Sequence, residues 1–146
     1  MKLLKKFILI IFINLTYCIT ANAADNLFEE AKKKFDKKDY ENSKFLFQRN
    51  IVFYPKSAES YLYLAKIFNN EENQQEEEKN LDTTLLLEPD NEEAIYMLIN
   101  IQLDRSNFDE VNILMNKLSN VCKKLCNKTE EIKKSLQDFE ANEKIN

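Results

Sequence analysis

The chain has 146 residues, 21 basic and 25 acidic side chains and a formal net charge of −4, and it contains no glycine, histidine or tryptophan. An acidic chain disfavours nucleic acids and anionic membrane surfaces as partners, because both are bound through basic patches. Glycine supplies the positive φ angles of hairpin turns and phosphate loops, so its absence argues against β-sandwich, dinucleotide-binding and P-loop folds and favours an all-α fold. Without histidine there is no imidazole base or imidazole metal ligand, and we expect no enzyme activity, no metal and no cofactor.

The N-terminal segment, residues 1–23, has the order of a secretory signal peptide. Residues 1–6 carry three lysines, residues 7–19 are mostly apolar, and small residues flank Asn22 in Ala21-Asn22-Ala23. The apolar run is shorter than the roughly 20 residues of a membrane-spanning helix. We expect cleavage between Ala23 and Ala24, which leaves 18 basic and 25 acidic residues in a periplasmic or secreted chain that does not insert stably into a membrane.

Two alternatives stay open at this end of the chain. An uncleaved signal would tether the protein to the membrane. Cys18 also follows an apolar run, as the lipidated cysteine of a lipoprotein does, although the bulky Tyr17 stands where lipoprotein signals have a small residue.

The remainder of the chain contains a 34-residue repeat. Pro55 and Pro89, the only prolines, are separated by one such period, and each follows an apolar stretch and precedes a polar pair and a new amphipathic run. The same shift aligns Ala31, Ala65 and Ile99, and also Phe47, Leu81 and Met115; two such shifts align Asp39-Tyr40 with Asn107-Phe108. Within the repeats, apolar residues recur at helical spacing, as in Tyr61, Leu64, Ala65 and Phe68. A fixed period of this length indicates stacked helical hairpins.

At these residues the chain resembles the tetratricopeptide repeat (TPR), a 34-residue helix–turn–helix unit. Ala31, Asp39-Tyr40, Ser43, Phe47 and Pro55 stand at the family's pattern positions in the first repeat. The resemblance implies an all-α, right-handed α-solenoid of three TPR-like repeats plus a C-terminal capping helix. Its expected parts are a signal peptide (1–23), repeats over 24–57, 58–91 and 92–124, and a capping helix with tail over 125–146.

The second repeat departs from the pattern. Glu77 occupies a position that is small in the family and Gln74 one that is aromatic, within the acidic run 71–78. We therefore expect a longer or shifted turn there and a poorly packed second helix. The turn glycines of the family are missing throughout, so other residues must accept the turn conformation: Lys38, Asn69 or Asn70, and Ser106 or Asn107.

The last segment, residues 129–141, is predicted to be the capping helix. Thr129 is its expected N-cap, because a threonine hydroxyl can accept a hydrogen bond from a first-turn N–H. Ile132, Leu136 and Phe139 form a narrow apolar stripe for packing against the third repeat.

Cys122 and Cys126 would be the only cysteines of the mature chain, an even number that in an oxidising compartment favours a disulfide. In an ideal helix, residues four apart have Cα atoms ~6.2 Å apart, near the upper limit for a disulfide. The bond therefore requires a helix that ends near Cys122 and a turn over residues 123–125. The alternative is a thiol-redox or metallochaperone accessory protein that uses the same pair.

The resemblance implies that partners bind on the concave surface lined by the first helix of each repeat. The predicted partner-binding residues are Phe28, Lys32, Phe35, Leu62, Lys66, Asn69, Tyr96 and Asn100. This set suits a peptide or helix with an acidic element. We therefore expect a non-catalytic adaptor or scaffold of the bacterial cell envelope, whose partners are other envelope proteins.

Overall fold

The structure, a computed structural model, describes residues 27–143 apart from the side chains of residues 135 and 138–143. The expected signal peptide over residues 1–23, its cleavage site at Ala23 and Ala24, and Cys18 lie outside the described residues. Every regular element within residues 27–143 is an α-helix. The chain forms two compact units, one ending at Tyr63 and one beginning at Leu64.

None of the helices within residues 27–143 is both long enough and apolar enough to cross a bilayer.

The first unit contains a helix over residues 27–36, helix α2 (Tyr40–Phe53) and the first half of α3 (Ala58–Asn70). Ala31 and Phe47 are fully buried between these helices. The buried Ser43 hydroxyl donates to the Ala31 carbonyl at 2.9 Å, which satisfies a polar group that would otherwise weaken the core. Small side chains at Ala31 and Ser43 allow the two helices to approach closely there.

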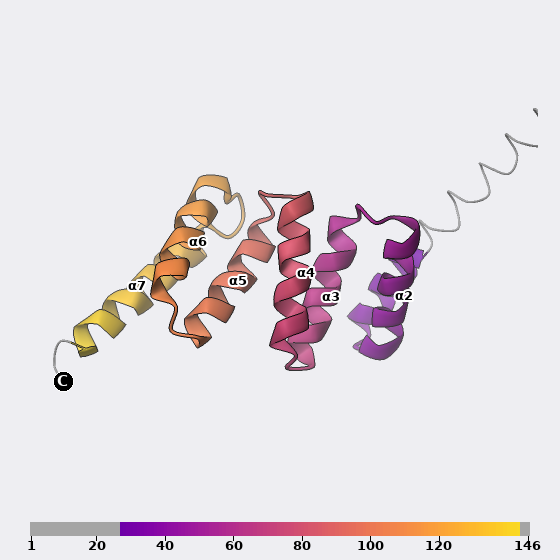
Figure 1. Cartoon of the computed structure of the whole chain (residues 1–146), viewed down its shortest axis with the longest axis horizontal. Helices are drawn as coiled ribbons and strands as arrows, with labels where there is room; N and C mark the ends of the chain where they lie inside the picture. The colour runs from indigo at the N-terminus through magenta and orange to yellow at the C-terminus, as the bar shows by residue number, and fades with distance from the viewer. Residues whose placement is uncertain (1–26, 144–146) are drawn as a thin grey trace, which may run out of the picture. The chain divides into compact units, whose positions relative to one another are not determined.

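The second unit continues α3 and adds α4 (Gln74–Leu87), α5 (Glu92–Asp104), α6 (Phe108–Val121) and α7 (Cys126–Glu143). Figure 1 shows that α4 to α7 follow one another in chain order, and each packs on the next. The centre of this core consists of fully buried aliphatic side chains: Ile67, Leu81, Ile95, Ile99, Val111 and Leu118. Ile132 and Leu136 of α7 are also buried, which gives α7 the packing expected of a capping helix.

The turns within the three helix pairs share one backbone geometry. Lys38, Glu72 and Ser106, which recur at the repeat period, have positive φ angles of 60°, 56° and 55°. In each turn the next N–H donates to the carbonyl five residues earlier at 2.9 Å, which is the hydrogen bond of a Schellman helix end. The prediction that Lys38 and Ser106 adopt the turn conformation is confirmed. The prediction of Asn69 or Asn70 is wrong, because the repeat period places the positive φ at Glu72.

Helix α4 keeps the register of the other repeats. It begins at Gln74, which lies one repeat period after Tyr40 and one before Phe108, the first residues of α2 and α6. The longer or shifted turn predicted for residues 71–78 is therefore wrong. Instead, several polar side chains of α4 are buried in the core.

The buried face of α4 is hydrogen-bonded within itself. Thr84 is fully buried and its hydroxyl donates to the Asn80 carbonyl at 2.9 Å, while the Asn80 amide donates to the Glu76 carbonyl at 2.7 Å. Buried polar groups with partners cost little, so this helix packs without the usual apolar stripe.

Helix α7 begins three residues earlier than predicted. It starts at Cys126, so Thr129 lies inside its first turn and is not the N-cap, and the Thr129 hydroxyl donates to the Cys126 carbonyl at 2.6 Å. Instead, a side chain distant in the sequence accepts hydrogen bonds from the backbone N–H groups that precede α7. The Glu92 carboxylate, at the start of α5, accepts from the N–H groups of Lys123, Lys124 and Leu125 at 2.8, 3.0 and 3.1 Å. These hydrogen bonds lower the pKa of Glu92.

Cys122 and Cys126 flank this loop. α6 ends at Val121 with Cys122 as its C-cap, and residues 123–125 form the turn that a disulfide between these cysteines requires. The two Cα atoms are 5.3 Å apart and the sulfur atoms are at bonding distance.

Candidate partner-binding surfaces

In the first unit, the predicted partner-binding aromatics belong to a cluster around Tyr63. The Tyr63 ring stacks on Phe47 with centroids 4.9 Å apart, and the Phe28 and Phe35 rings meet it edge-on at 6.0 and 5.1 Å. Phe28 and Phe35 are half-buried, so a large part of each ring already packs inside the unit. Tyr63 was not among the predicted residues, although it organises this surface.

Two other predicted residues lie nearby along the chain. Lys32 is half-buried, and Leu62 is only 6% exposed, so most of the Leu62 side chain packs in the core and is not open to a partner.

In the second unit, Asn69 of α3 and Asn100 of α5 line one pocket of about 340 Å³, which we name the acidic pocket. Its other lining residues come from α5, α4 and the turn before α4: Glu72, Gln74, Glu77, Met97, Ile101 and Asp104. None of these lining residues is a cation. The two amides that the sequence predicted are therefore brought together, among three carboxylates.

The most buried carboxylate of the acidic pocket is Glu77, which is 4% exposed. Its carboxylate accepts from the Asn69 side-chain amide at 3.0 Å. Burial raises the pKa of Glu77, the Asn69 hydrogen bond opposes this, and the negative charge of Asp104 raises it further. Burial and the neighbouring carboxylate therefore make the ionised form of Glu77 unfavourable.

The remaining predicted residues of this unit lie on the same two helices. The Lys66 ammonium forms an ion pair with Glu93 at 2.8 Å, and Tyr96 is half-buried. Because Lys66 is paired, it offers less attraction to the acidic ligand that the sequence suggested.

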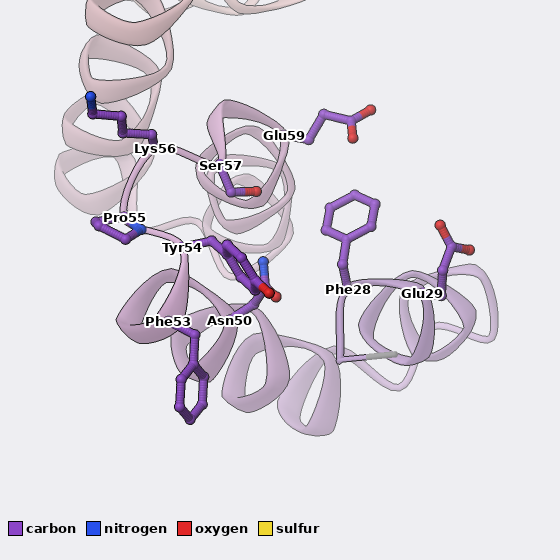
Figure 2. Close-up of a pocket in the computed structure, with 9 residues that line it drawn as sticks. All are labelled: Phe28, Glu29, Asn50, Phe53, Tyr54, Pro55, Lys56, Ser57 and Glu59. Atoms are coloured by element: carbon purple, nitrogen blue, oxygen red, sulfur yellow. The ribbon is translucent and has the colours of Figure 1, made fainter. Parts of the chain in front are cut away.

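A second pocket, of about 660 Å³, lies within the first unit and was not predicted. We name it the aromatic pocket, and Figure 2 shows its lining residues: Phe28, Glu29, Asn50, Phe53, Tyr54, Pro55, Lys56, Ser57 and Glu59. It forms where α2 ends and the proline turn leads into α3. In the sequence, only Pro55 indicated a junction between helices here.

Among the side chains that the structure describes, no group of three or more cysteines, aspartates and glutamates is close enough together to bind a metal ion.

The paired helices, their 34-residue register and their Schellman turns define a tetratricopeptide fold. No protein-family model matches the chain, and no characterised protein matches its sequence. Solved structures do match it. The type III secretion translocator chaperone SycD of Yersinia enterocolitica has a TM-score of 0.75 and 10% identity over 83% of this chain and 88% of its own. The same chaperone in complex with a peptide of the translocator YopD gives 0.71 and 10%, over 84% and 95%.

A third similar structure is the first TPR domain of Spaghetti (RPAP3), bound to the HSP90 peptide SRMEEVD. Its TM-score is 0.66 with 13% identity, over 78% of this chain and 95% of that domain. These likenesses confirm the all-α tetratricopeptide fold that the sequence predicted.

Proposed function

We propose that this protein is a non-catalytic adaptor that binds a basic segment of another protein at the acidic pocket. The observation that carries the proposal is the convergence of Asn69, Asn100 and three carboxylates on one pocket without a cation. The sequence suggested a partner segment with an acidic element. We propose a basic element instead, because the lining of the acidic pocket is negatively charged.

The lining of the acidic pocket suits a peptide. Met97 and Ile101 supply an apolar surface, and the Asn69 and Asn100 amides can donate to and accept from a peptide backbone. Glu72, Glu77 and Asp104 would attract a lysine or arginine side chain. Peptide binding also occurs on this fold, since structurally similar proteins hold a YopD peptide and an HSP90 peptide.

The cellular location is part of the proposal. A signal peptide over residues 1–23, cut between Ala23 and Ala24, would deliver the chain to an oxidising envelope compartment, where Cys122 and Cys126 would form a disulfide. The partner would then be another envelope protein. The repeat boundaries at 58 and 92 are supported by the first residues of α3 and α5, Ala58 and Glu92.

The test is selection of peptides from a displayed random library on the mature protein, followed by affinity measurement. We expect enrichment of sequences with lysine or arginine. The pocket variant is Glu72→Lys/Asp104→Asn. Both replacements are compatible with the fold, because Lys38 and Asn70 stand at the equivalent positions of the preceding repeats.

This variant should weaken binding by about tenfold, since each lost charge contact contributes roughly 0.5–1 kcal/mol. The matched control is Glu30→Lys/Asp36→Asn, which changes the net charge equally at exposed positions outside the pocket and should leave the affinity unchanged. Enrichment of acidic peptides, or equal weakening by both double variants, would refute the proposal.

A further inference from the structure

Asn50 of α2 carries a buried acceptor without a donor. The residue is 3% exposed and lines the aromatic pocket. Its side-chain amide donates to the Ser60 hydroxyl at 2.9 Å, but its Oδ1 accepts no hydrogen bond from any described residue. Native cores rarely leave a buried acceptor unpaired, so this atom requires an explanation.

Packing does not require an amide at this position. Thr84 and Leu118 stand at the same position of the second and third repeats, and both are fully buried. Thr84 satisfies its hydroxyl within its own helix, and leucine has no polar group to satisfy. The first repeat alone places a side-chain amide there, beside a pocket.

The walls of the aromatic pocket supply two further features. Figure 2 shows the Phe28 and Tyr54 rings on either side of the open space, with the Glu29 and Glu59 carboxylates on the side of Phe28. Both carboxylates are exposed, and neither forms an ion pair or hydrogen bond with a residue of the described part of the chain. The Lys56 side chain points away from the rings.

We propose that the aromatic pocket binds an arginine side chain of a partner protein. The aliphatic stem would pack between the rings, and the guanidinium would lie over an aromatic face. A guanidinium has five N–H donors in a planar fork, so it could donate to Asn50 Oδ1 and to the rim carboxylates together. Lysine offers a compact charge on a flexible stem and fits this combination less well. The proposal goes beyond the function proposed above, because the aromatic pocket shares no residue with the acidic pocket.

The probe is Nα-acetyl-arginine amide, titrated into ¹⁵N-labelled protein and followed by NMR. We expect the largest shifts at the Asn50 side-chain amide and at the backbone amides of residues 54–59. The citrulline analogue has nearly the same shape but no charge, and it should bind at least about fivefold more weakly. Shifts of equal size with citrulline, no saturable shifts in this pocket, or shifts confined to Asn69 and Asn100 would overturn the proposal.

Two variants separate the contributions. Glu29→Gln/Glu59→Gln should weaken arginine binding about fivefold, whereas Glu30→Gln/Glu41→Gln removes two exposed carboxylates outside the pocket and should have no effect. Asn50→Leu copies the third repeat and should weaken binding about tenfold. Should Asn50→Leu not fold, the exposed glutamate pair still decides, and equal affinities for both glutamate variants would overturn the assignment.

This titration is independent of the acidic pocket. The variant Glu72→Lys/Asp104→Asn should leave arginine binding at the aromatic pocket unchanged. Failure of the peptide adaptor proposal and failure of the arginine pocket therefore give different results.

Discussion

Replacing Glu92 by alanine should loosen α7 without unfolding the rest of the molecule. The Glu92 carboxylate is the acceptor for three successive N–H groups in the loop that leads into α7. No other side chain is shown to bind these groups in the described structure. The variant would leave them to water, because Lys123 and Lys124 are exposed.

The magnitude follows from the kind of hydrogen bond that is lost. Loss of a helix-capping side chain costs about 0.5–2 kcal/mol, and hydrogen bonds to a charged group contribute about 1.5–3 kcal/mol when water does not replace them. Because water reaches this loop, we expect a loss of about 1–2 kcal/mol in the stability of α7. That corresponds to a factor of about 5–30 in the opening equilibrium.

Native-state hydrogen exchange measures this opening directly. Amides of α7 near Ile132 and Leu136 should exchange about 5–30-fold faster in Glu92→Ala, while amides of α2 keep their rates. The control is Glu130→Ala, an exposed carboxylate on α7 itself. Unchanged α7 exchange in Glu92→Ala, or an equal effect of Glu130→Ala, would show that the capping role is wrong.

The same carboxylate predicts a pH dependence. Its pKa is lower in the folded chain than in the unfolded chain, so its stabilisation is complete above about pH 5 and is lost as the pH falls through the folded pKa. The difference in α7 stability between wild type and Glu92→Ala should therefore disappear in acid. A difference that persists in acid, once the Glu92 carboxyl is protonated in the folded chain, would contradict the ionised carboxylate as its source.

Three further predictions concern the core and the cysteines. Phe47→Ala should lower the free energy of unfolding by about 3–5 kcal/mol in chemical denaturation, because the ring is fully buried. Phe53 is 58% exposed, so Phe53→Ala should change stability by less than about 0.5 kcal/mol. Similar losses in the two variants would contradict the assigned core. Cys122→Ser/Cys126→Ser should cost about 2 kcal/mol. The native chain from residue 24 onward, kept under oxidising conditions, should contain no thiol that reacts with an alkylating reagent. Two readily alkylated thiols would refute the disulfide. Glu77→Gln should stabilise the protein at neutral pH, because burial raises the pKa of this carboxyl and makes its ionised form unfavourable. That gain should shrink as the pH falls below the folded pKa, and a destabilised Glu77→Gln at neutral pH would contradict it.

The parts of the fold that follow a local rule could be predicted from the sequence. The 34-residue period aligned Phe47, Ala65 and Ile99 with equivalent positions of the other repeats, and all three are fully buried. Helix geometry alone gave the condition for joining Cys122 to Cys126, and the turn between them meets it.

Where local preference and the repeat period disagreed, the period was the better guide. Asparagine tolerates positive φ more easily than glutamate, yet the turn of the second repeat falls at Glu72, in step with Lys38 and Ser106. The packing of the whole helix pair sets that position, and an exposed glutamate accepts a strain of roughly 1–2 kcal/mol.

Features that depend on long-range contacts could not be predicted. Glu92 lies far before the loop that it caps, on a different helix, and no local pattern links the two. The sequence pattern also did not decide which side chains of α3 face the core: Leu62 is buried, and the adjacent Tyr63 stacks on Phe47. The charge of the acidic pocket arises from residues of three successive segments that only folding brings together.

Binding of a basic peptide at the acidic pocket can be observed at the residues that line it. The measurement is NMR of ¹⁵N-labelled protein comprising residues 24–146 with a peptide selected from the displayed library. We expect saturable shifts of the Asn69 and Asn100 side-chain amides, and loss of these shifts in Glu72→Lys/Asp104→Asn. Saturable binding that leaves both amides unshifted would contradict it.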